Sequence, residues 1–316
     1  MKRIGSLYEK ICSIENLYLA DALAQRGKSR QYGVIVHNKN QDSNLTKLQT
    51  MLLDKTFKTS RYTIFKVFEP KEREVFRLPY FPDRIVHYAI MNVLEEIFVA
   101  VFTTDTYSCI KRKGIHAALR GVKRALKDVD GSKYCLKFDI RKFYPSVDHE
   151  VLKQLLRKKI KDKELLWLLD EVIDSAPGLP IGNYLSQFLA NFYLAYFDHW
   201  MKEKVRVRYY FRYADDIVIL SGSKEHLHEV FDRCNEYLMV NLKLDIKANY
   251  QIFPVESRGI DFVGYKCFHT HTMLRKGIKK RFARAVKKKK SRESIASYLG
   301  WAKHANCRNL IKKLIK

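Results

Sequence analysis

Hydrophobic residues recur at helical spacing in several stretches of the chain. Residues 1–55 have the spacing of helices around a polar turn, and residues 83–102 follow the same period. Residues 183–203 place their apolar side chains on one stripe, which predicts a helix of roughly 30 Å. A further helix is predicted over residues 224–240, with Ser221 or Ser223 as its N-cap. The stripe of the earlier helix consists of Leu185, Phe188, Leu189, Phe192, Tyr196 and Trp200.

Other stretches alternate apolar and polar residues with the two-residue period of strands. Residues 61–82 alternate as short strands, and residues 134–139 predict a half-buried strand that ends near Asp139 and turns Asp139 away from the core. Aromatic and β-branched runs flank Asp215 and Asp216 on both sides, which predicts that this acidic pair lies at a hairpin turn.

The acidic pair at this turn has two interpretations. Asp is a common turn residue because its side chain can hydrogen-bond to its own backbone, so the pair could be structural. The usual hairpin signal is Asn-Gly or Asp-Gly, however, and adjacent like charges repel unless a cation lies between them. If the strand ending at Asp139 joins the hairpin in one antiparallel sheet, three carboxylates converge and can hold two Mg²⁺ ions about 3.5 to 4 Å apart. Such a site supports phosphoryl transfer to a 3′-hydroxyl.

The net charge of the chain indicates what kind of partner it binds. Its 316 residues include 60 Lys and Arg against 34 Asp and Glu, a formal charge of +26, which indicates a polyanionic partner. A membrane surface is disfavoured because no stretch of about 18 apolar residues occurs. We therefore expect a nucleic-acid-binding protein with no membrane association. The N-terminus lacks the apolar core of a secretory signal, so a cytoplasmic location is expected.

Positive charge is densest near the end of the sequence. Residues 275–290 carry ten Lys or Arg and no acidic residue. Such a run is usually a solvated face, but here apolar residues interleave it at helical spacing. We therefore interpret residues 271–316 as a basic helical subdomain that grips nucleic acid.

Four stretches, in order, resemble the palm motifs of reverse transcriptases. They are "LKFDIRKFYPSVD", "GLPIGNYLSQFLANFYLAYFD", "YFRYADDIVIL" and "GIDFVGYK". Upstream, "PKEREVFRLPYFPDRIVHYAI" and "TYSCIKRKGIHAAL" look like the fingers motifs of the group II intron-like branch. The resemblance implies an α+β right-hand polymerase with fingers, a palm of antiparallel sheet plus helices, and a small helical thumb. The corresponding divisions are an N-terminal helical extension (1–60), fingers (61–133), palm (134–270, with a fingers-like insertion near 150–180) and thumb (271–316).

The resemblance also assigns site residues. It makes Asp139, Asp215 and Asp216 catalytic and makes them, with Ile140, the ligands of two Mg²⁺ ions, for which Mn²⁺ can substitute. Tyr144 matches the aromatic steric gate that excludes a ribose 2′-hydroxyl, although it could instead be a core aromatic beside Phe143. The resemblance places nucleotide contacts at Lys71, Arg73, Ile181, Gly182 and Gln187, with Lys111, Arg112 and Lys113 as supplements. It places the primer grip at Phe262, Val263, Gly264 and Tyr265. Lys247 is a weaker candidate for the lysine near the pyrophosphate. Buried strand packing is the alternative for Phe262 and Tyr265.

One motif departs from the common family pattern. Most members read Gln-Gly-x-x-x-Ser-Pro before the long helix, whereas this chain has Ile181 and Gln187 at the two ends. Ile181 removes hydrogen bonding at the nucleotide pocket, and a loss of about 3 kcal/mol in discrimination would raise misincorporation roughly a hundredfold.

This version of the motif is similar to reverse transcriptases of diversity-generating retroelements, which are prokaryotic or phage-encoded. Those enzymes copy a template-repeat RNA into cDNA with errors at adenines, so the resemblance implies template RNA, a cDNA/RNA hybrid, dNTPs and an accessory variability protein as partners. Adenine selectivity follows from the resemblance alone.

Other reverse transcriptases are the alternatives. A group II intron enzyme would need a longer thumb and an extension. A retron enzyme would need an Asn-Ala-x-x-His stretch and a Val-Thr-Gly motif in its thumb, and neither motif occurs in the sequence. An abortive-infection enzyme stays open. A non-catalytic nucleic-acid-binding protein would also explain the charge, but binding alone does not need converging carboxylates in a basic channel.

Overall fold

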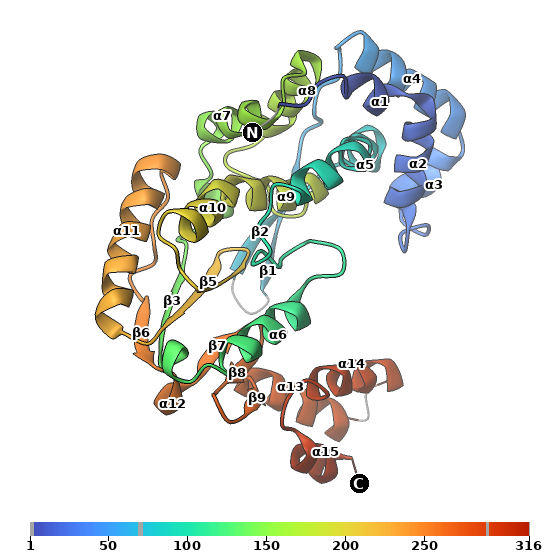
Figure 1. The fold of residues 1–316 in the computed structure, drawn as a ribbon. Helices are drawn as coiled ribbons and strands as arrows, with labels where there is room; N and C mark the ends of the chain where they lie inside the picture. The colour runs from blue at the N-terminus through green and yellow to red at the C-terminus, as the bar shows by residue number, and fades with distance from the viewer. Residues whose placement is uncertain (1–2, 69–71, 289–290, 316) are drawn as a thin grey trace. The chain divides into compact units, whose positions relative to one another are not determined.

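The computed structural model describes residues 3–68, 72–288 and 291–315, whose helices and strands are drawn in Figure 1. The chain forms two compact units. The first contains the residues up to 102 together with 142–196 and 240–244, and the second contains residues 103–141, 197–239 and those from 245 onward. Helices and antiparallel sheets both occur, so the predicted α+β class is confirmed.

The first unit is mostly helical, as the spacing of its apolar residues predicts. Helix α5 (Ile85–Val99) packs against α2 (Ile14–Gln25) and α9 (Tyr184–Tyr193). The rings of Phe98 and Phe192 meet there with centroids 5.1 Å apart. The other helical segments of this unit are α1 (Tyr8–Cys12), α3 (Tyr32–Asn38), α4 (Gln41–Leu53), α7 (His149–Lys159), α8 (Lys163–Ile173) and the short turns Tyr80–Arg84 and Tyr144–Ser146.

The first unit also contains the strands predicted within residues 61–82. β1 (Thr63–Phe68) and β2 (Glu72–Arg77) form an antiparallel hairpin, and every residue of β1 is exposed. The hairpin is anchored at β2, where the backbone N–H of Phe76 donates to the carbonyl of Ile181 at 2.8 Å. The ring of Phe76 also packs edge-on against Tyr62 at 5.6 Å.

A four-stranded antiparallel sheet is the centre of the second unit (Figure 1). Its strands lie in the order β4 (Tyr209–Tyr213), β5 (Asp216–Ser221), β3 (Tyr134–Asp139) and β6 (Gln251–Pro254). The prediction of a half-buried β3 is wrong at its start, because Cys135 and Leu136 are both fully buried. Cys135 belongs to a hydrophobic cluster shared with residues of α6 (Ile115–Ala125) and of a second sheet. Further along β3, Lys137 and Asp139 are partly exposed, so the covered face opens at the end of the strand.

The second sheet has three short strands in the order β7 (Ile260–Phe262), β8 (Tyr265–Cys267) and β9 (Thr272–Leu274). The helix predicted over residues 224–240 is α11 (Lys224–Leu242), and the Ser223 hydroxyl caps it by accepting from the N–H of His226 at 3.0 Å. The other helices are α10 (Ala195–Glu203), α12 (Val255–Arg258), α13 (Lys276–Lys287), α14 (Arg292–Ala302) and α15 (Arg308–Leu314). No helix formed by the described residues is long and apolar enough to cross a bilayer.

The helix predicted over residues 183–203 is not continuous. It is divided at Leu194, whose ψ of −3° lies away from the helical value, into α9 and α10. The apolar stripe is nevertheless largely buried: Leu185, Phe188, Leu189 and Phe192 all lie in the core. Hydrophobic periodicity therefore identified the buried face but not the break, which depends on one backbone angle.

A buried ion pair connects α10 to β4 in the second unit. The guanidinium of Arg212 donates to both carboxylate oxygens of Asp198 at 2.6 to 3.0 Å, and both side chains are fully buried. Tyr210 and Thr106 donate to the same carboxylate at 2.6 and 2.9 Å. Burial acts to lower the pKa of Arg212, but the charge and hydrogen bonds of Asp198 raise it above the usual value, so the guanidinium stays charged.

We predict that Asp198→Asn destabilises the second unit strongly. The substitution keeps the shape of the side chain but leaves the Arg212 charge buried without its counter-ion, which costs about 3 to 5 kcal/mol. Urea unfolding followed by circular dichroism measures the loss. Glu164→Gln is the control, because its ion pair with Lys55 is exposed on both sides and should contribute less than about 1 kcal/mol. Equal losses in the two variants would contradict the prediction.

Candidate functional site

The end of β3 and the β4–β5 hairpin bring the predicted carboxylates to one edge of the four-stranded sheet. Asp139 lies directly opposite Asp216 in the antiparallel register, so the two side chains share a face. Just beyond the strand, the N–H of Ile140 faces the carbonyl of Asp215 at 3.4 Å. The sheet thus places together all four residues that the sequence suggested as metal ligands.

The hairpin turn has the predicted location and an unusual backbone. Tyr213 pairs with Asp216, which leaves Ala214 and Asp215 as the two turn residues. Ala214 has a φ of +54°, in the left-handed region that favours glycine. The guanidinium of Arg212 donates to the carbonyl of Ala214 at 3.1 Å and so supports this turn from within the protein.

Two lysines neutralise the carboxylates. The Lys137 ammonium lies 3.2 Å from each Asp216 oxygen, but only Oδ2 is hydrogen-bonded, and Oδ1 is buried without a hydrogen-bond partner. Lys247 lies 3.5 Å from Asp139 and also donates its backbone N–H to the Asp139 carbonyl at 2.9 Å. Burial raises the pKa of Asp216 to about 6; Lys137 opposes the shift, and Asp139 and Asp215 add to it. The negative charge of Asp216 is therefore only partly stabilised by its surroundings.

The donor atoms at this edge suit a hard divalent cation. Carboxylate oxygens and a backbone carbonyl are the ligands that Mg²⁺ prefers, and the buried, unbonded oxygen of Asp216 is such a donor. Among the residues that the structure describes, however, no three His, Cys, Asp or Glu side chains are gathered closely enough to hold an ion. Metal binding would therefore require the carboxylates to turn from their lysine partners toward the ion.

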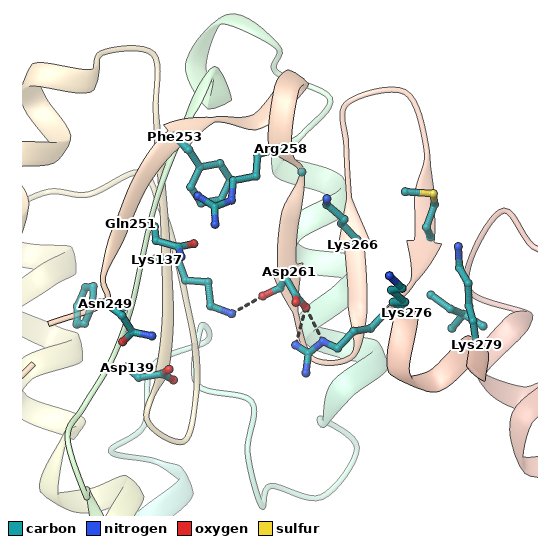
Figure 2. A pocket seen from close by; sticks show the side chains of 15 residues that line it. Lys137, Asp139, Asn249, Gln251, Phe253, Arg258, Asp261, Lys266, Lys276 and Lys279 are labelled. Carbon is teal, nitrogen blue, oxygen red and sulfur yellow. Dashed lines mark hydrogen bonds and ion pairs between the residues drawn. The ribbon is translucent and has the colours of Figure 1, made fainter. Parts of the chain in front are cut away.

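A basic pocket of about 660 Å³ adjoins Asp139 in the second unit (Figure 2). The four-stranded sheet supplies one side of its lining and β7–β9 with the start of α13 the other. Its cationic lining residues are Lys137, Arg258, Lys266, Arg275, Lys276 and Lys279. Figure 2 shows Lys137 reaching toward Asp261, whose backbone carbonyl accepts a hydrogen bond from it. The Asp261 carboxylate pairs in turn with Arg275 at 2.6 Å. The pocket offers positive charge beside the carboxylate edge.

Sequence reasoning missed Lys137. Its place in a strand that alternates polar and apolar residues made it look like an ordinary surface lysine. The available signal was the two-residue spacing from Asp139, because residues two apart in a strand point to the same face.

The β7–β8 turn contains the predicted primer grip. Phe262 and Tyr265 are buried, and the Tyr265 hydroxyl donates to the carbonyl of Trp301 at 3.0 Å, so these side chains hold the turn in place. Val263 and Gly264 form the turn itself, with φ of +42° and +89°. A Cβ at Gly264 would lie 2.5 Å from the Trp301 ring, so glycine is required there.

Four of the predicted nucleotide contacts, Arg73, Ile181, Gly182 and Gln187, lie in the first unit. Arg73 is an exposed residue of β2, and Lys71 lies outside the described residues. Gly182 has a φ of +119° and packs so closely that a Cβ would lie 2.8 Å from the Phe76 carbonyl oxygen. Gln187 is exposed on α9. Gly182 and Gln187 both line a small pocket of this unit, and Arg73 is not among its lining residues.

Two further positions can be placed by their contacts. The backbone carbonyl of Tyr144 accepts from the N–H of Leu179 at 2.8 Å, and the Tyr144 ring lies 5.7 Å from that of Phe143. Tyr144 is only partly buried, unlike a core aromatic. In the second unit, the Lys113 ammonium donates to the carbonyls of Thr103, Thr104 and Thr106, so it holds its own loop together.

Comparison with known proteins gives a consistent result. The family model described as "Reverse transcriptase (RNA-dependent DNA polymerase)" matches residues 69–267, more than half of the chain. Protein YkfC of Escherichia coli is 25% identical over 249 residues, which cover 64% of this chain and 65% of YkfC. The group II intron-encoded protein LtrA of Lactococcus lactis is 23% identical over 287 residues, which cover 67% of this chain and 47% of LtrA. The chain thus spans between about half and two thirds of these relatives.

Among solved structures, telomerase from Candida tropicalis is similar in fold. The apo enzyme superposes with a TM-score of 0.54 at 12% identity, over 81% of this chain and 56% of that one. Its complex with a fragment of telomeric RNA gives a TM-score of 0.52, also at 12% identity, over 85% of this chain and 58% of that one. The predicted right-hand polymerase fold is confirmed by this likeness.

We predict that Asp216→Asn stabilises the protein at neutral pH in the presence of EDTA. The folded state holds the Asp216 proton up to a pKa of about 6, whereas the unfolded chain releases it near the ordinary value of 3.8. Stability contributed by this proton is therefore present at low pH and is lost as the pH rises between these values. The variant lacks this loss, so its free energy of unfolding at pH 7.5 should exceed that of the wild type by about 1 to 2 kcal/mol.

Urea unfolding at pH 5 and pH 7.5 measures the effect as a difference between variants, which cancels the titration of other groups. Lys137→Met is the matched control, because removing the ammonium should enlarge the loss of stability with rising pH. An Asp216→Asn variant with the pH dependence of the wild type would rule out this origin.

Proposed function

The chain belongs to the reverse transcriptase family, and we propose that it is an RNA-directed DNA polymerase that extends a primer with dNTPs. The observation that carries the proposal is the pairing of Asp139 with Asp216 across β3 and β5, beside the turn that contains Asp215. A protein that only bound nucleic acid would gain nothing from three carboxylates gathered at one edge of a sheet.

The carboxylates are proposed to hold two Mg²⁺ ions, with the carbonyl of Ile140 as an additional ligand and Mn²⁺ as a substitute. Bound there, the ions would supply the charge that activates a 3′-hydroxyl and neutralises the pyrophosphate. The chain's own contribution is placement: Arg212 fixes the hairpin, and Lys137 and Lys247 balance the carboxylates until a cation binds.

The remaining contacts are proposed by position. The basic pocket beside Asp139 would receive the backbone of the primer strand, with the Val263–Gly264 turn as the primer grip. Lys71, Arg73, Ile181, Gly182 and Gln187 would contact the incoming nucleotide and its template base. Binding through phosphates should weaken steeply with salt.

We further propose that the enzyme serves a diversity-generating retroelement in a prokaryotic or phage context. Ile181 and Gln187 support this reading, because neither can make the contacts of the common Gln and Pro at a nucleotide pocket. The proposed partners are a template-repeat RNA, the cDNA/RNA hybrid and an accessory variability protein, and the proposed location is the cytoplasm. Synthesis should then carry errors opposite template adenines.

A group II intron-type reverse transcriptase is the second candidate. The match to LtrA, a group II intron-encoded protein, favours it. The two candidates differ in the accuracy of the copy.

We predict that Mg²⁺-dependent DNA synthesis on an RNA template falls at least a thousandfold in Asp139→Asn and in Asp215→Asn, because each loses a carboxylate that stabilises the transition state. Primer extension with dNTPs measures the rate. Asp232→Asn, an exposed acidic residue of α11, is the matched control and should leave the rate unchanged.

Sequencing of the same cDNA separates the two candidates. Errors concentrated opposite adenines support the retroelement proposal, and accurate copies support the intron-type enzyme. If the wild type makes no DNA even with its native RNA and accessory protein, the polymerase proposal fails and binding alone remains.

We also predict that Tyr144→Ala increases ribonucleotide incorporation relative to dNTPs about ten- to a hundredfold, because the ring that would collide with the 2′-hydroxyl is gone. Tyr144→Phe keeps the ring and should retain the discrimination of the wild type. Competition between a dNTP and the corresponding rNTP in single-nucleotide extension measures the ratio. Unchanged ratios in both variants would assign Tyr144 to packing beside Phe143.

A further inference from the structure

The first unit contains a small pocket of about 180 Å³ whose lining includes Gly182 and Gln187, two of the predicted nucleotide contacts, together with cationic side chains to which no role was assigned. Three segments far apart in the sequence supply its lining: the loop after α2, the start of α5, and the start of α9. The side chains that matter are Lys28, Arg84, His87, Tyr88, Tyr184 and Gln187. Two of these residues, Lys28 and Arg84, are cations, and no Asp or Glu among the described residues lines the pocket.

The two cations are not neutralised within the pocket. Burial lowers the pKa of Lys28, and the like charge of Arg84 lowers it further. Arg84 donates to the neutral amide oxygen of Gln31 at 3.3 Å. Its neighbour Asp83 is buried and accepts from the N–H of Ser60 at 2.9 Å. An anion between Lys28 and Arg84 would turn this repulsion into two attractions.

His87 adds a polar group of a different kind. It is only 3% exposed, and its Nε2 atom has no hydrogen-bond partner among the described residues. Burial, with the charge of Arg84, lowers the pKa of His87 to about 4, so the ring is neutral at physiological pH. A buried polar atom without a partner is costly, and a neutral imidazole that carries its proton on Nε2 can donate to an anionic oxygen.

The start of α9 provides a third contribution. Asn183 occupies the N-cap position, but its side chain makes no capping bond and donates to the Tyr62 hydroxyl at 3.1 Å. The start of this ten-residue helix lines the pocket, and the positive end of its dipole favours an anion there. Beside it, the rings of Tyr88 and Tyr184 stack with centroids 4.7 Å apart and form a rigid wall.

We propose that this pocket binds a phosphate group, held by Lys28, Arg84 and the Nε2–H of His87 at the start of α9. Given the proposed polymerase function, on which this inference rests for its ligand, the phosphate comes either from the backbone of the RNA template or from the triphosphate of a dNTP. In both cases Lys28 gives the N-terminal extension a direct part in substrate binding.

The test is a binding measurement that does not need catalysis. Fluorescence anisotropy of a labelled RNA–primer duplex with a single-stranded template overhang is recorded over a range of salt concentrations. Each phosphate contact on a single strand contributes about 0.7 to the slope of log K against log salt. Lys28→Gln should weaken binding and reduce the slope by about this amount. Lys47→Gln, an exposed lysine of α4, is the matched control and should change neither quantity.

His87→Phe separates the hydrogen bond from the charge. It removes a neutral donor, so it should weaken binding several-fold without changing the slope. Thermal melting of each variant shows whether it is folded, and Lys28→Gln, at a partly exposed loop position, carries the test if His87→Phe is not.

Two arms distinguish the sources of the phosphate. Neutral methylphosphonate linkages are introduced one at a time along the overhang. A linkage that weakens binding to the wild type but not to Lys28→Gln identifies a template phosphate. If no linkage does so, but inorganic tripolyphosphate binds the wild type more tightly than Lys28→Gln, the phosphate is that of a dNTP.

The inference is overturned if neither arm responds to Lys28→Gln. Its failure is distinct from failure of the proposed function. If the protein makes DNA but Lys28→Gln changes neither binding measurement, only the phosphate-site inference fails. If Lys28→Gln weakens binding but the protein makes no DNA, only the polymerase proposal fails.

Discussion

The ion pair between Arg212 and Asp198 is the interaction on which the candidate site depends. Both groups are fully buried, and their bidentate pairing joins β4 to α10, while Tyr210 and Thr106 donate to the same carboxylate. The same guanidinium donates to the carbonyl of Ala214 in the hairpin turn. The hydrogen bonds of the buried Arg212 guanidinium fix its orientation. The turn before Asp216, which accepts one of these bonds, is therefore held in a fixed position.

That rigidity is needed because the carboxylate edge is locally unfavourable. Ala214 adopts a left-handed backbone, and Asp216 faces Asp139 from a site where burial raises its pKa to about 6. Lys137 offsets part of this repulsion and connects Asp216 to the carbonyl of Asp261 in the second sheet. Strained backbone and crowded charge persist only where the surrounding structure over-determines them, and they concentrate at functional sites.

The sequence was sufficient to predict the two elements of this edge because the information for each is local, whereas their pairing, between segments far apart in the chain, was implied by the family resemblance. Alternation located β3 and its end at Asp139, and two β-branched runs located the hairpin of Asp215 and Asp216. Features that depend on distant partners were missed. Cys135 looked half-exposed because α6 and β7–β9 cover it from elsewhere in the chain, and the pocket of Lys28 and His87 combines segments with no shared pattern. The division of the predicted long helix at Leu194 depends on one backbone angle, for which periodicity gives no signal.

The backbone contacts of Ile181 explain how this position can differ from the Gln of the common family motif. The hairpin strand β2 contacts this segment through the backbone, since the N–H of Phe76 donates to the carbonyl of Ile181. That bond is indifferent to the side chain at position 181, so Ile can replace the Gln of the common motif without disturbing the anchor. The next residue has no such freedom, because Gly182 combines a φ of +119° with a Cβ position 2.8 Å from the Phe76 carbonyl. The backbone geometry of the motif is therefore kept while its hydrogen-bonding side chain is lost, which is the combination that the proposed retroelement enzyme would require.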